Sequence, residues 1–457
     1  MRILNSRFNL AFVQILLFAS VVLFSNCGGK GSNSLPEKFN FSKVSTIKCS
    51  EDTTQSYSLY LPSSFDNKKQ WPLIFLYDPH GNGNLSIENF KEAAERYGYI
   101  LVGSNNSRNG VAGTEDIIGK LVNDVFSKFP IDKQRIYAAG FSGGARVALN
   151  QALMMSNIKG IMMAGASANR VDFSSHNHKF DIYATAGLGD FNYLEVTSIQ
   201  EQLQGLGWRF MLREFEGGHA WPPKEVINEA VLWFTLNAMR DKVIAKEETL
   251  IDKVFAEERF QIDSLIDAGH LVAAEQAANN AVSLLKKLSS TKKLEHSIEK
   301  IKKMPEYKAE MELRSQSFNV ENEWKQGLIN SFTSKDTAWW RKQLAELELR
   351  INSPGDVYSR QMFMRVKGFL GIVAYTFTND IIMRNQMDQA QRLISIYQII
   401  EPANADVMFF KAIMLDRQNK TSEALSCVKK ARKLGFSDWK KFNEVASSAL
   451  KEGISRN

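Results

Sequence analysis

The sequence predicts an α/β domain, with a mostly parallel sheet flanked by helices, followed by an all-α domain. Residues 40–242 alternate short apolar runs with amphipathic stretches, and strands alternating with helices of about 10–15 residues are typical of a parallel sheet covered on both faces. After residue 243 no clear strand run occurs and helical periodicity dominates. A composition of 44% hydrophobic and 23% charged residues is typical of a folded globular protein.

Length and charge place few limits on function. The 457 residues suffice for two or three domains. The net charge of +7 is modest for this length and argues neither for nor against nucleic-acid binding. No nucleic-acid partner is expected. The densest basic run, with seven Lys between residues 286 and 303, is interpreted as a solvated helix face. No cluster of Cys and His has the spacing of metal ligands, and no metal site is expected.

The N-terminal segment has the pattern of a secretory signal. Arg2 and Arg7 precede an almost wholly apolar run over residues 8–24, and a positive flank before a short apolar run is typical of such signals. Cys27 follows the run after small and polar residues, which resembles the lipobox of bacterial lipoproteins. We therefore predict a lipoprotein signal peptide over residues 1–27, with Cys27 lipidated.

A flexible, glycine-rich tether is expected over residues 28–39. Several acyl chains on Cys27 would be enough for stable anchoring. The predicted location is therefore the bacterial cell envelope, at a membrane on its periplasmic or outer face. A retained N-terminal helix is the alternative anchor, and it would also hold the protein at a membrane outside the cytoplasm.

The elements of the α/β domain follow in order from the change between short apolar runs and helical periodicity. Strands are expected at residues 57–62, 72–77, 99–103, 135–140, 158–164, 180–186 and 209–215. Helices are expected at residues 87–97, 117–129, 144–155, 194–206 and 223–239.

The all-α domain, residues 243–457, contains an internal repeat. Two helical units follow each other at a spacing of 34 residues, most clearly over residues 371–436, and this period resembles the tetratricopeptide repeat. Such helix pairs stack into concave surfaces that bind other chains, so a protein partner is expected here. A generic helical bundle is the alternative interpretation. The repeat is carried by Ala390, Tyr397 and Pro402, matched by Ala424, Ala431 and Phe436.

The stretch around Ser142 is the most informative for chemistry. An apolar strand leads into Gly140-Phe-Ser142-Gly-Gly144, and a helical run follows. A G-x-S-x-G sequence between strand and helix is typical of a nucleophile elbow, in which a tight turn lifts the Ser hydroxyl above the sheet. The alternative is a glycine-rich turn whose Ser only caps a helix.

An acid and a histidine should follow this nucleophile in that order, each just past a strand end. The strand at residues 180–186 is followed by Asp190, and the strand at residues 209–215 by His219. His219 is the one histidine after Asp190 within this domain. Asp181 and Glu195 lie near enough in the sequence to be alternative acids.

These residue types predict acyl transfer. His219 would take the proton of Ser142 as the hydroxyl attacks and then return it to the leaving alcohol, while Asp190 holds the imidazole. One donor to the oxyanion should be the backbone N–H of Gly143. The other should come from the loop after residues 72–77, where either Gly81 or Asn82 could supply it.

Four motifs together resemble the esterase group that includes polyhydroxybutyrate depolymerases and feruloyl esterases: HGNG, GFSGG, GLGD and GGHAWP. The resemblance is confined to residues 40–242. It implies the α/β-hydrolase fold and ester hydrolysis with no metal and no cofactor. A serine peptidase of the same fold is one alternative function. A non-enzymatic binding lipoprotein, acting through its helical repeats, is another.

Two expectations concern access to this site. The segment at residues 168–179 is too short to form a lid over bound lipid, so an open cleft is predicted for soluble or polymer-borne esters. The pattern of the α/β domain is complete by Met239, and nothing chemical is expected of residues 243–457. A chain that ends near Lys242 should therefore keep its activity on small esters.

Overall fold

The computed structural model describes residues 41–168, 171–176 and 178–455. Within them lies one eight-stranded sheet with the order β1-β2-β4-β3-β5-β6-β7-β8. Six neighbouring strands run parallel to one another, namely β4, β3, β5, β6, β7 and β8. Strand β2 is antiparallel to both of its neighbours, β1 and β4. The strands are β1 (Ser45–Lys48), β2 (Ser56–Tyr60), β3 (Trp71–Tyr77), β4 (Ile100–Ser104), β5 (Ile131–Phe141), β6 (Ile158–Ala164), β7 (Asp181–Gly187) and β8 (Phe210–Phe215).

Helices cover both faces of the sheet, because its central strands are apolar on both sides. All seven residues of β3 and of β7 are buried. Helices α1 (Gly83–Tyr97) and α6 (Lys224–Arg240) pack on one face, where Phe90 and Trp233 are fully buried. On the other face lie α2 (Thr114–Lys128), α3 (Gly143–Met154), α4 (Tyr193–Thr197) and α5 (Gln200–Gly205).

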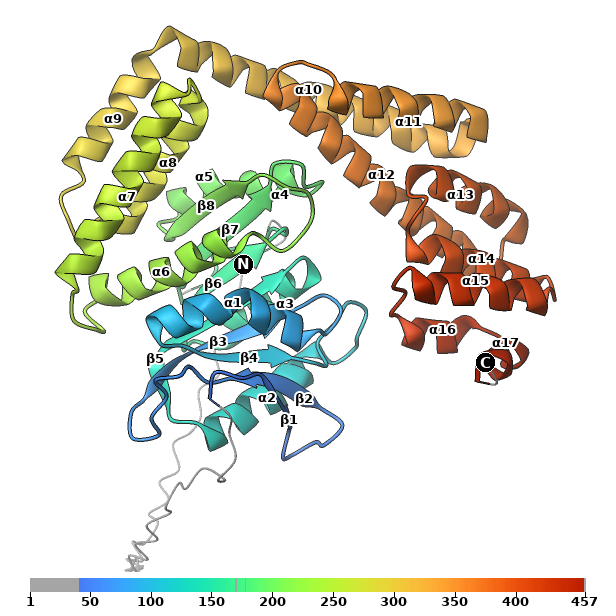
Figure 1. The fold of residues 1–457 in the computed structure, drawn as a ribbon, viewed down its shortest axis with the longest axis horizontal. Helices are drawn as coiled ribbons and strands as arrows, with labels where there is room; N and C mark the ends of the chain where they lie inside the picture. The colour runs from blue at the N-terminus through green and yellow to red at the C-terminus, as the bar shows by residue number, and fades with distance from the viewer. Residues whose placement is uncertain (1–40, 169–170, 177, 456–457) are drawn as a thin grey trace, which may run out of the picture.

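The predicted fold class, a mostly parallel sheet flanked by helices and followed by an all-α region, is confirmed (Figure 1). Two elements differ from the expectation. Strand β1 was not predicted, because its four residues alternate between half-buried and exposed at the edge of the sheet. The single helix expected at residues 194–206 is two short helices, α4 and α5.

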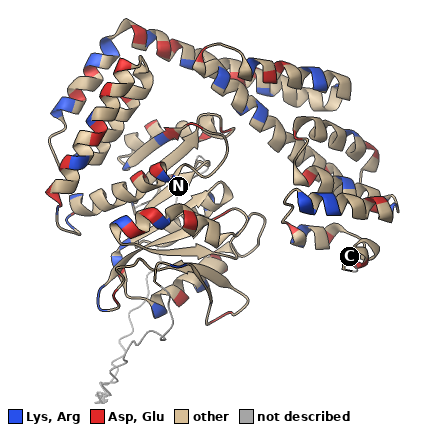
Figure 2. Cartoon of the chain, viewed as in Figure 1, with Lys and Arg blue, Asp and Glu red and all other residues tan. Residues whose placement is uncertain are grey.

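The all-α region runs from α6 past the β8 edge of the sheet and then back along the side of the sheet domain (Figure 1). Figure 2 shows basic and acidic residues interleaved along its helices, which agrees with solvated helix faces. Helices α13 and α15 begin 34 residues apart, while the assignment to tetratricopeptide repeats stays a prediction. The helices are α7 (Glu248–Asp267), α8 (Leu271–Leu285), α9 (Lys292–Lys303), α10 (Pro305–Ser334), α11 (Thr337–Asn352), α12 (Val357–Met383), α13 (Met387–Ile400), α14 (Ala405–Arg417), α15 (Thr421–Lys433), α16 (Trp439–Val445) and α17 (Ser448–Ser455).

The helical region shares its hydrophobic core with the sheet domain. Val254 of α7 and Leu284 of α8 are buried in the same cluster as Trp233 of α6. Asn280 of α8 donates from Nδ2 to the backbone oxygen of Leu212 in β8, at 2.9 Å. The two regions therefore share a buried apolar core, and their division into separate domains near residue 242 stays a prediction.

The predicted signal peptide, Cys27 and the tether lie outside the described residues. Within the part of the chain that is described, no helix has both the length and the apolar character that crossing a membrane requires.

Candidate active site

Ser142 occupies a strained turn between β5 and α3. Its backbone has φ 52° and ψ −118°, a region that non-glycine residues seldom adopt. A Cβ atom at Gly140 would lie 2.2 Å from the carbonyl oxygen of Gly144, and one at Gly144 would lie 2.1 Å from that of Tyr77. The two glycines of the motif are therefore required by backbone contact on both sides of Ser142.

Ser142, His219 and Asp190 form a continuous line of hydrogen bonds. His219 Nε2 lies 3.0 Å from Ser142 Oγ, and His219 Nδ1 lies 2.9 Å from Asp190 Oδ1 and 3.0 Å from its Oδ2. Asp190 is fully buried, and its Oδ1 also accepts the backbone N–H of Asn192 at 2.8 Å. The structure thus brings together the three residues that the sequence singled out.

The two alternative acids lie elsewhere. Asp181 is at the opposite end of β7, where its carboxylate accepts from Arg209 Nε at 2.6 Å and from Asn237 Nδ2 at 2.6 Å. Burial raises the pKa of Asp181 to about 6, against the opposing effect of Arg209. Glu195 faces Arg146 at 3.6 Å. Neither carboxylate is bonded to His219.

Two aromatic rings flank His219. The ring centroid of Phe191 lies 4.3 Å from that of the imidazole, and the ring of Phe141 lies 4.7 Å away on the strand side. Phe191 directly follows Asp190, so the loop that supplies the acid also supplies this apolar wall. Phe191 was not predicted as a site residue, although its position directly after the candidate acid could have indicated it.

The candidate oxyanion donors differ in their surroundings. Gly143 opens α3, and a Cβ atom there would lie 1.7 Å from Asn109 Oδ1. The Gly81 N–H already donates to the carbonyl oxygen of Asp78 at 3.0 Å, within a turn where Gly81 has φ 72°. Asn82 lines the cavity described below, and its side chain caps the N-terminus of α1 by accepting the Leu85 N–H. Asn109, in the loop between β4 and α2, was not predicted as a site residue.

A buried carboxylate joins the loop after β3 to the histidine loop. Asp78, 2% exposed, accepts from Trp221 Nε1 at 3.1 Å and from the His80 N–H at 2.9 Å. Burial opposes ionisation of Asp78, but the hydrogen bonds from His80 and Trp221 prevail and lower its pKa. This contact joins Asp78, two residues before the HGNG stretch, to Trp221 of the GGHAWP stretch.

The acid-bearing loop packs against helix α12 of the helical region. Arg365 donates from Nη1 to the carbonyl oxygen of Leu188 at 2.8 Å, and its guanidinium lies 4.8 Å from the ring centroid of Tyr193. Arg365 is 2% exposed and donates from Nε to Glu321 at 2.7 Å. A buried arginine in a helix carries no sequence signal that separates it from a surface arginine, so this contact was missed.

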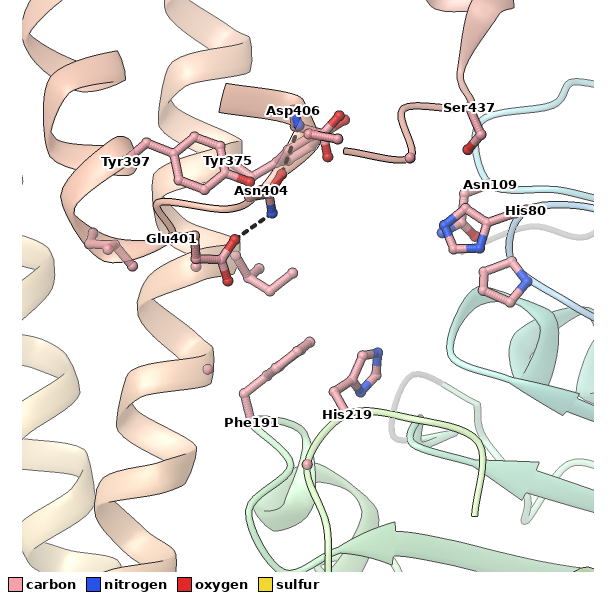
Figure 3. Close-up of a pocket in the computed structure, with 18 of the residues that line it drawn as sticks. His80, Asn109, Phe191, His219, Tyr375, Tyr397, Glu401, Asn404, Asp406 and Ser437 are labelled. Atoms are coloured by element: carbon pink, nitrogen blue, oxygen red, sulfur yellow. Dashed lines mark hydrogen bonds between the residues drawn. The ribbon is translucent and has the colours of Figure 1, made fainter. Parts of the chain in front are cut away.

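The helical region lines one side of the cleft above His219. A cavity of about 1280 Å³ lies between the two regions. Figure 3 shows Phe191 and His219 at its floor, with His80 and Asn109 on the side of the sheet domain. The opposite wall comes from α12 and from the turn between α13 and α14, and includes Tyr375, Tyr397, Glu401, Asn404 and Asp406.

Among the residues that the structure describes, no group of three or more His, Cys, Asp and Glu side chains is arranged to hold a metal ion.

The strand order and the strand–turn–helix around Ser142 define the class of protein as an α/β-hydrolase fold. No family model and no curated protein matches the chain. Among solved structures, S-formylglutathione hydrolase from Staphylococcus aureus is 15% identical, with a TM-score of 0.35 over 43% of this chain and 98% of that one. A hyperthermophilic esterase from Pyrobaculum calidifontis is 15% identical, with a TM-score of 0.36 over 44% and 87%. A ferulic acid esterase is 18% identical, with a TM-score of 0.35 over 42% and 96%. At these values the matches establish no activity for this chain.

Proposed function

We propose that the protein is a serine esterase that cleaves carboxylic esters through an acyl-enzyme intermediate. The observation that carries the proposal is the hydrogen-bonded line from Ser142 Oγ to His219 and on to buried Asp190, at 3.0 and 2.9 Å. A nucleophile, a base within hydrogen-bond reach, and a third group that orients the base are the geometric requirements for nucleophilic catalysis by serine.

The reaction has two halves. Ser142 Oγ attacks the carbonyl carbon while His219 Nε2 takes its proton, and the tetrahedral adduct collapses as His219 returns that proton to the leaving alcohol oxygen. Water then attacks the acyl carbon, with His219 as base, and the carboxylic acid leaves as Ser142 regains its proton. Asp190, fixed by the Asn192 N–H, holds Nδ1 protonated and stabilises the imidazolium.

The developing oxyanion needs donors beside Ser142. The N–H of Gly143, at the N-terminus of α3, is our first candidate. Asn82 is favoured over Gly81 as the source of the second donor, since the Gly81 N–H is engaged with Asp78. The Asn109 side chain lies against Gly143 and is a further candidate.

The substrates proposed are acyl or aryl esters borne on carbohydrate or polyester. Small-molecule sites are commonly about 300–1,000 Å³, so a cavity of about 1280 Å³ has room for more than a simple ester. We further propose that Cys27 anchors the protein to a membrane on the periplasmic or outer face of a bacterial envelope, and that the helical region meets a protein partner outside this cavity.

A fluorophosphonate probe tests the proposal directly. The wild-type protein should be labelled covalently and should hydrolyse p-nitrophenyl acetate, whereas Ser142→Ala should do neither while keeping its melting temperature. Ser198→Ala, at an exposed serine of the same domain, is the matched control and should behave as wild type. Labelling that persists in Ser142→Ala would remove Ser142 from the mechanism.

A further inference from the structure

We propose that Glu401, Asn404 and Asp406, at the turn between α13 and α14, form a subsite for an uncharged, hydroxyl-rich part of the substrate, such as a sugar ring. The inference rests on the proposed function, since this wall faces the same cavity as His219 (Figure 3). This subsite gives the helical region a role in recognising the substrate, whereas the sequence predicted that role for the sheet domain alone.

The Glu401 carboxylate is held in a defined position. Asn404 donates from Nδ2 to Glu401 Oε2 at 2.5 Å. A Cβ atom at Gly371 would lie 2.2 Å from Glu401 Oε1, so the carboxylate rests against α12 where only glycine leaves room for it. A fixed carboxylate at a cavity wall is an acceptor that is oriented before the ligand arrives, which lowers the entropy lost on binding.

The side-chain carboxylate of Asp406 can accept further hydrogen bonds. Its backbone N–H donates to Asn404 Oδ1 at 2.7 Å, whereas no hydrogen bond or ion pair to its carboxylate occurs within the described residues. Burial raises the pKa of Asp406, partly offset by Lys441, and the neighbouring Asp438 and Glu401 raise it further. A half-buried carboxylate without a partner carries a desolvation cost, which a hydroxyl donor from a ligand would offset.

The charges around the cavity match neither a cation nor an anion. The helical side carries Glu401, Asp406 and Asp438, together with Glu348 and Lys367, which form an ion pair with each other. The side of the sheet domain carries Arg108, His80 and Asp78. The hydrogen bond with Asp78 raises the pKa of His80 against the effect of burial, and the carboxylates of Asp406 and Asp438 add to the rise. An ammonium group would face Arg108 and His80, and a carboxylate or phosphate would face the carboxylates of Glu401, Asp406 and Asp438.

Hydroxyl groups can bind to both the acidic and the basic side of the cavity, because each hydroxyl donates to a carboxylate and accepts from a cationic or amide N–H. The aromatic rings of Phe191 and Tyr375 also line the cavity, and their apolar faces suit the C–H faces of a ring. A polyester chain offers no O–H donors along its length, so the carboxylate wall favours a carbohydrate ester over a polyester.

The first test compares rates on two substrates. The ratio of kcat/KM for an O-acetylated xylo-oligosaccharide to kcat/KM for p-nitrophenyl acetate should fall about tenfold in Glu401→Gln and in Asp406→Asn, chiefly through KM, as expected for loss of a hydrogen bond to a charged group. Asp388→Asn, at an exposed position on the same α13, is the control and should keep the wild-type ratio. An unchanged ratio in both cavity variants would overturn the subsite.

The second test measures binding without turnover. Ser142→Ala protein should bind the acetylated oligosaccharide in calorimetry, and the added Glu401→Gln change should weaken that binding about tenfold. If sugar binding depends on Glu401 but the wild type hydrolyses no ester, the subsite is supported and the esterase function is overturned. If the wild type hydrolyses p-nitrophenyl acetate but the Ser142→Ala protein binds no sugar, the esterase function is supported and the subsite is overturned. Preference for acetylcholine over the sugar ester, lost in Asp406→Asn, would overturn the uncharged class of ligand.

Discussion

Arg365 of helix α12 donates a hydrogen bond to the carbonyl oxygen of Leu188, at 2.8 Å, two residues before Asp190. The same guanidinium covers the ring of Tyr193, three residues after Asp190. The loop that aims the acid at His219 is therefore held on both sides of Asp190 by a residue from outside the sheet domain. Arg365 does not reach His219 or Ser142, so its role is to position the loop.

Arg365→Met should lower kcat on p-nitrophenyl acetate about 10-fold or more while leaving KM within about twofold, since small misplacements of a catalytic group cost this much in rate. Stability should also fall, although Lys325 remains 2.6 Å from Glu321 and keeps that carboxylate paired. The control is Arg360→Met, exposed on the same helix. If kcat were unchanged while the melting temperature fell, Arg365 would be structural only.

His219→Ala should reduce kcat by several orders of magnitude, and Asp190→Asn by a comparable or smaller factor, because the two residues act as a unit with Ser142. Single-turnover rates of the two variants and of the wild type measure these losses. A near-normal kcat in Asp190→Asn would contradict its role.

Glu258→Gln should stabilise the protein at neutral and alkaline pH. Burial, followed by the like charge of Glu229, raises the pKa of Glu258 to about 7, against about 4.3 in an unfolded chain. The folded protein therefore holds this proton more tightly, and the wild type loses stability as pH rises from about 4 through about 7.

The gain from Glu258→Gln should accordingly grow over that range and level off above about pH 8, at up to about 3 kcal/mol. Urea unfolding at several pH values measures it. Glu258 is 9% exposed, and its Oε2 is buried without a hydrogen-bond partner. Asp252→Asn, at an exposed position on the same helix, should leave the pH profile unaltered, and an equal gain there would argue against burial as the cause.

A chain shortened to end at Lys242 should fail to fold stably, in contrast to the expectation from sequence. Removing α7 and α8 exposes the apolar residues of α6 that they bury and leaves Arg240 without the carbonyl oxygens of Ser283 and Leu284. Dye binding and protease sensitivity would report the exposed surface. A soluble fragment that melts cooperatively and keeps wild-type activity would restore the two-module interpretation.

The sheet and the candidate site were largely predictable, because their signals are local. Buried parallel strands such as β3 are continuous apolar runs, and the turn at Ser142 demands glycines at fixed spacing. The order of acid and histidine followed from where strands end. Even the split of α4 from α5 is a small departure, at a place where the chain must turn within a few residues.

The contribution of the helical region was not predictable in the same way. Arg365 contacts the sheet domain, and Glu401 lines the shared cavity, only after the chain has passed through α7 to α11. Nothing in their own sequence neighbourhood distinguishes them from charged residues on a solvated helix face. Gly368 and Gly371 were local hints, because a glycine inside a long helix usually needs a packing reason. For Gly371 that reason is Glu401, and Gly368 lies against Phe191.

Helix α12 also sets a length. Met364, Gly368, Gly371 and Tyr375 all line the cavity, at the spacing of a single helix face. A rise of about 1.5 Å per residue separates Met364, beside Gly189, from Tyr375 by roughly 16 Å. If the proposed function holds, a short ester would occupy only the end near His219, whereas an oligomer of that span would contact the whole face, and the size of the molecule that carries the ester would select the substrate.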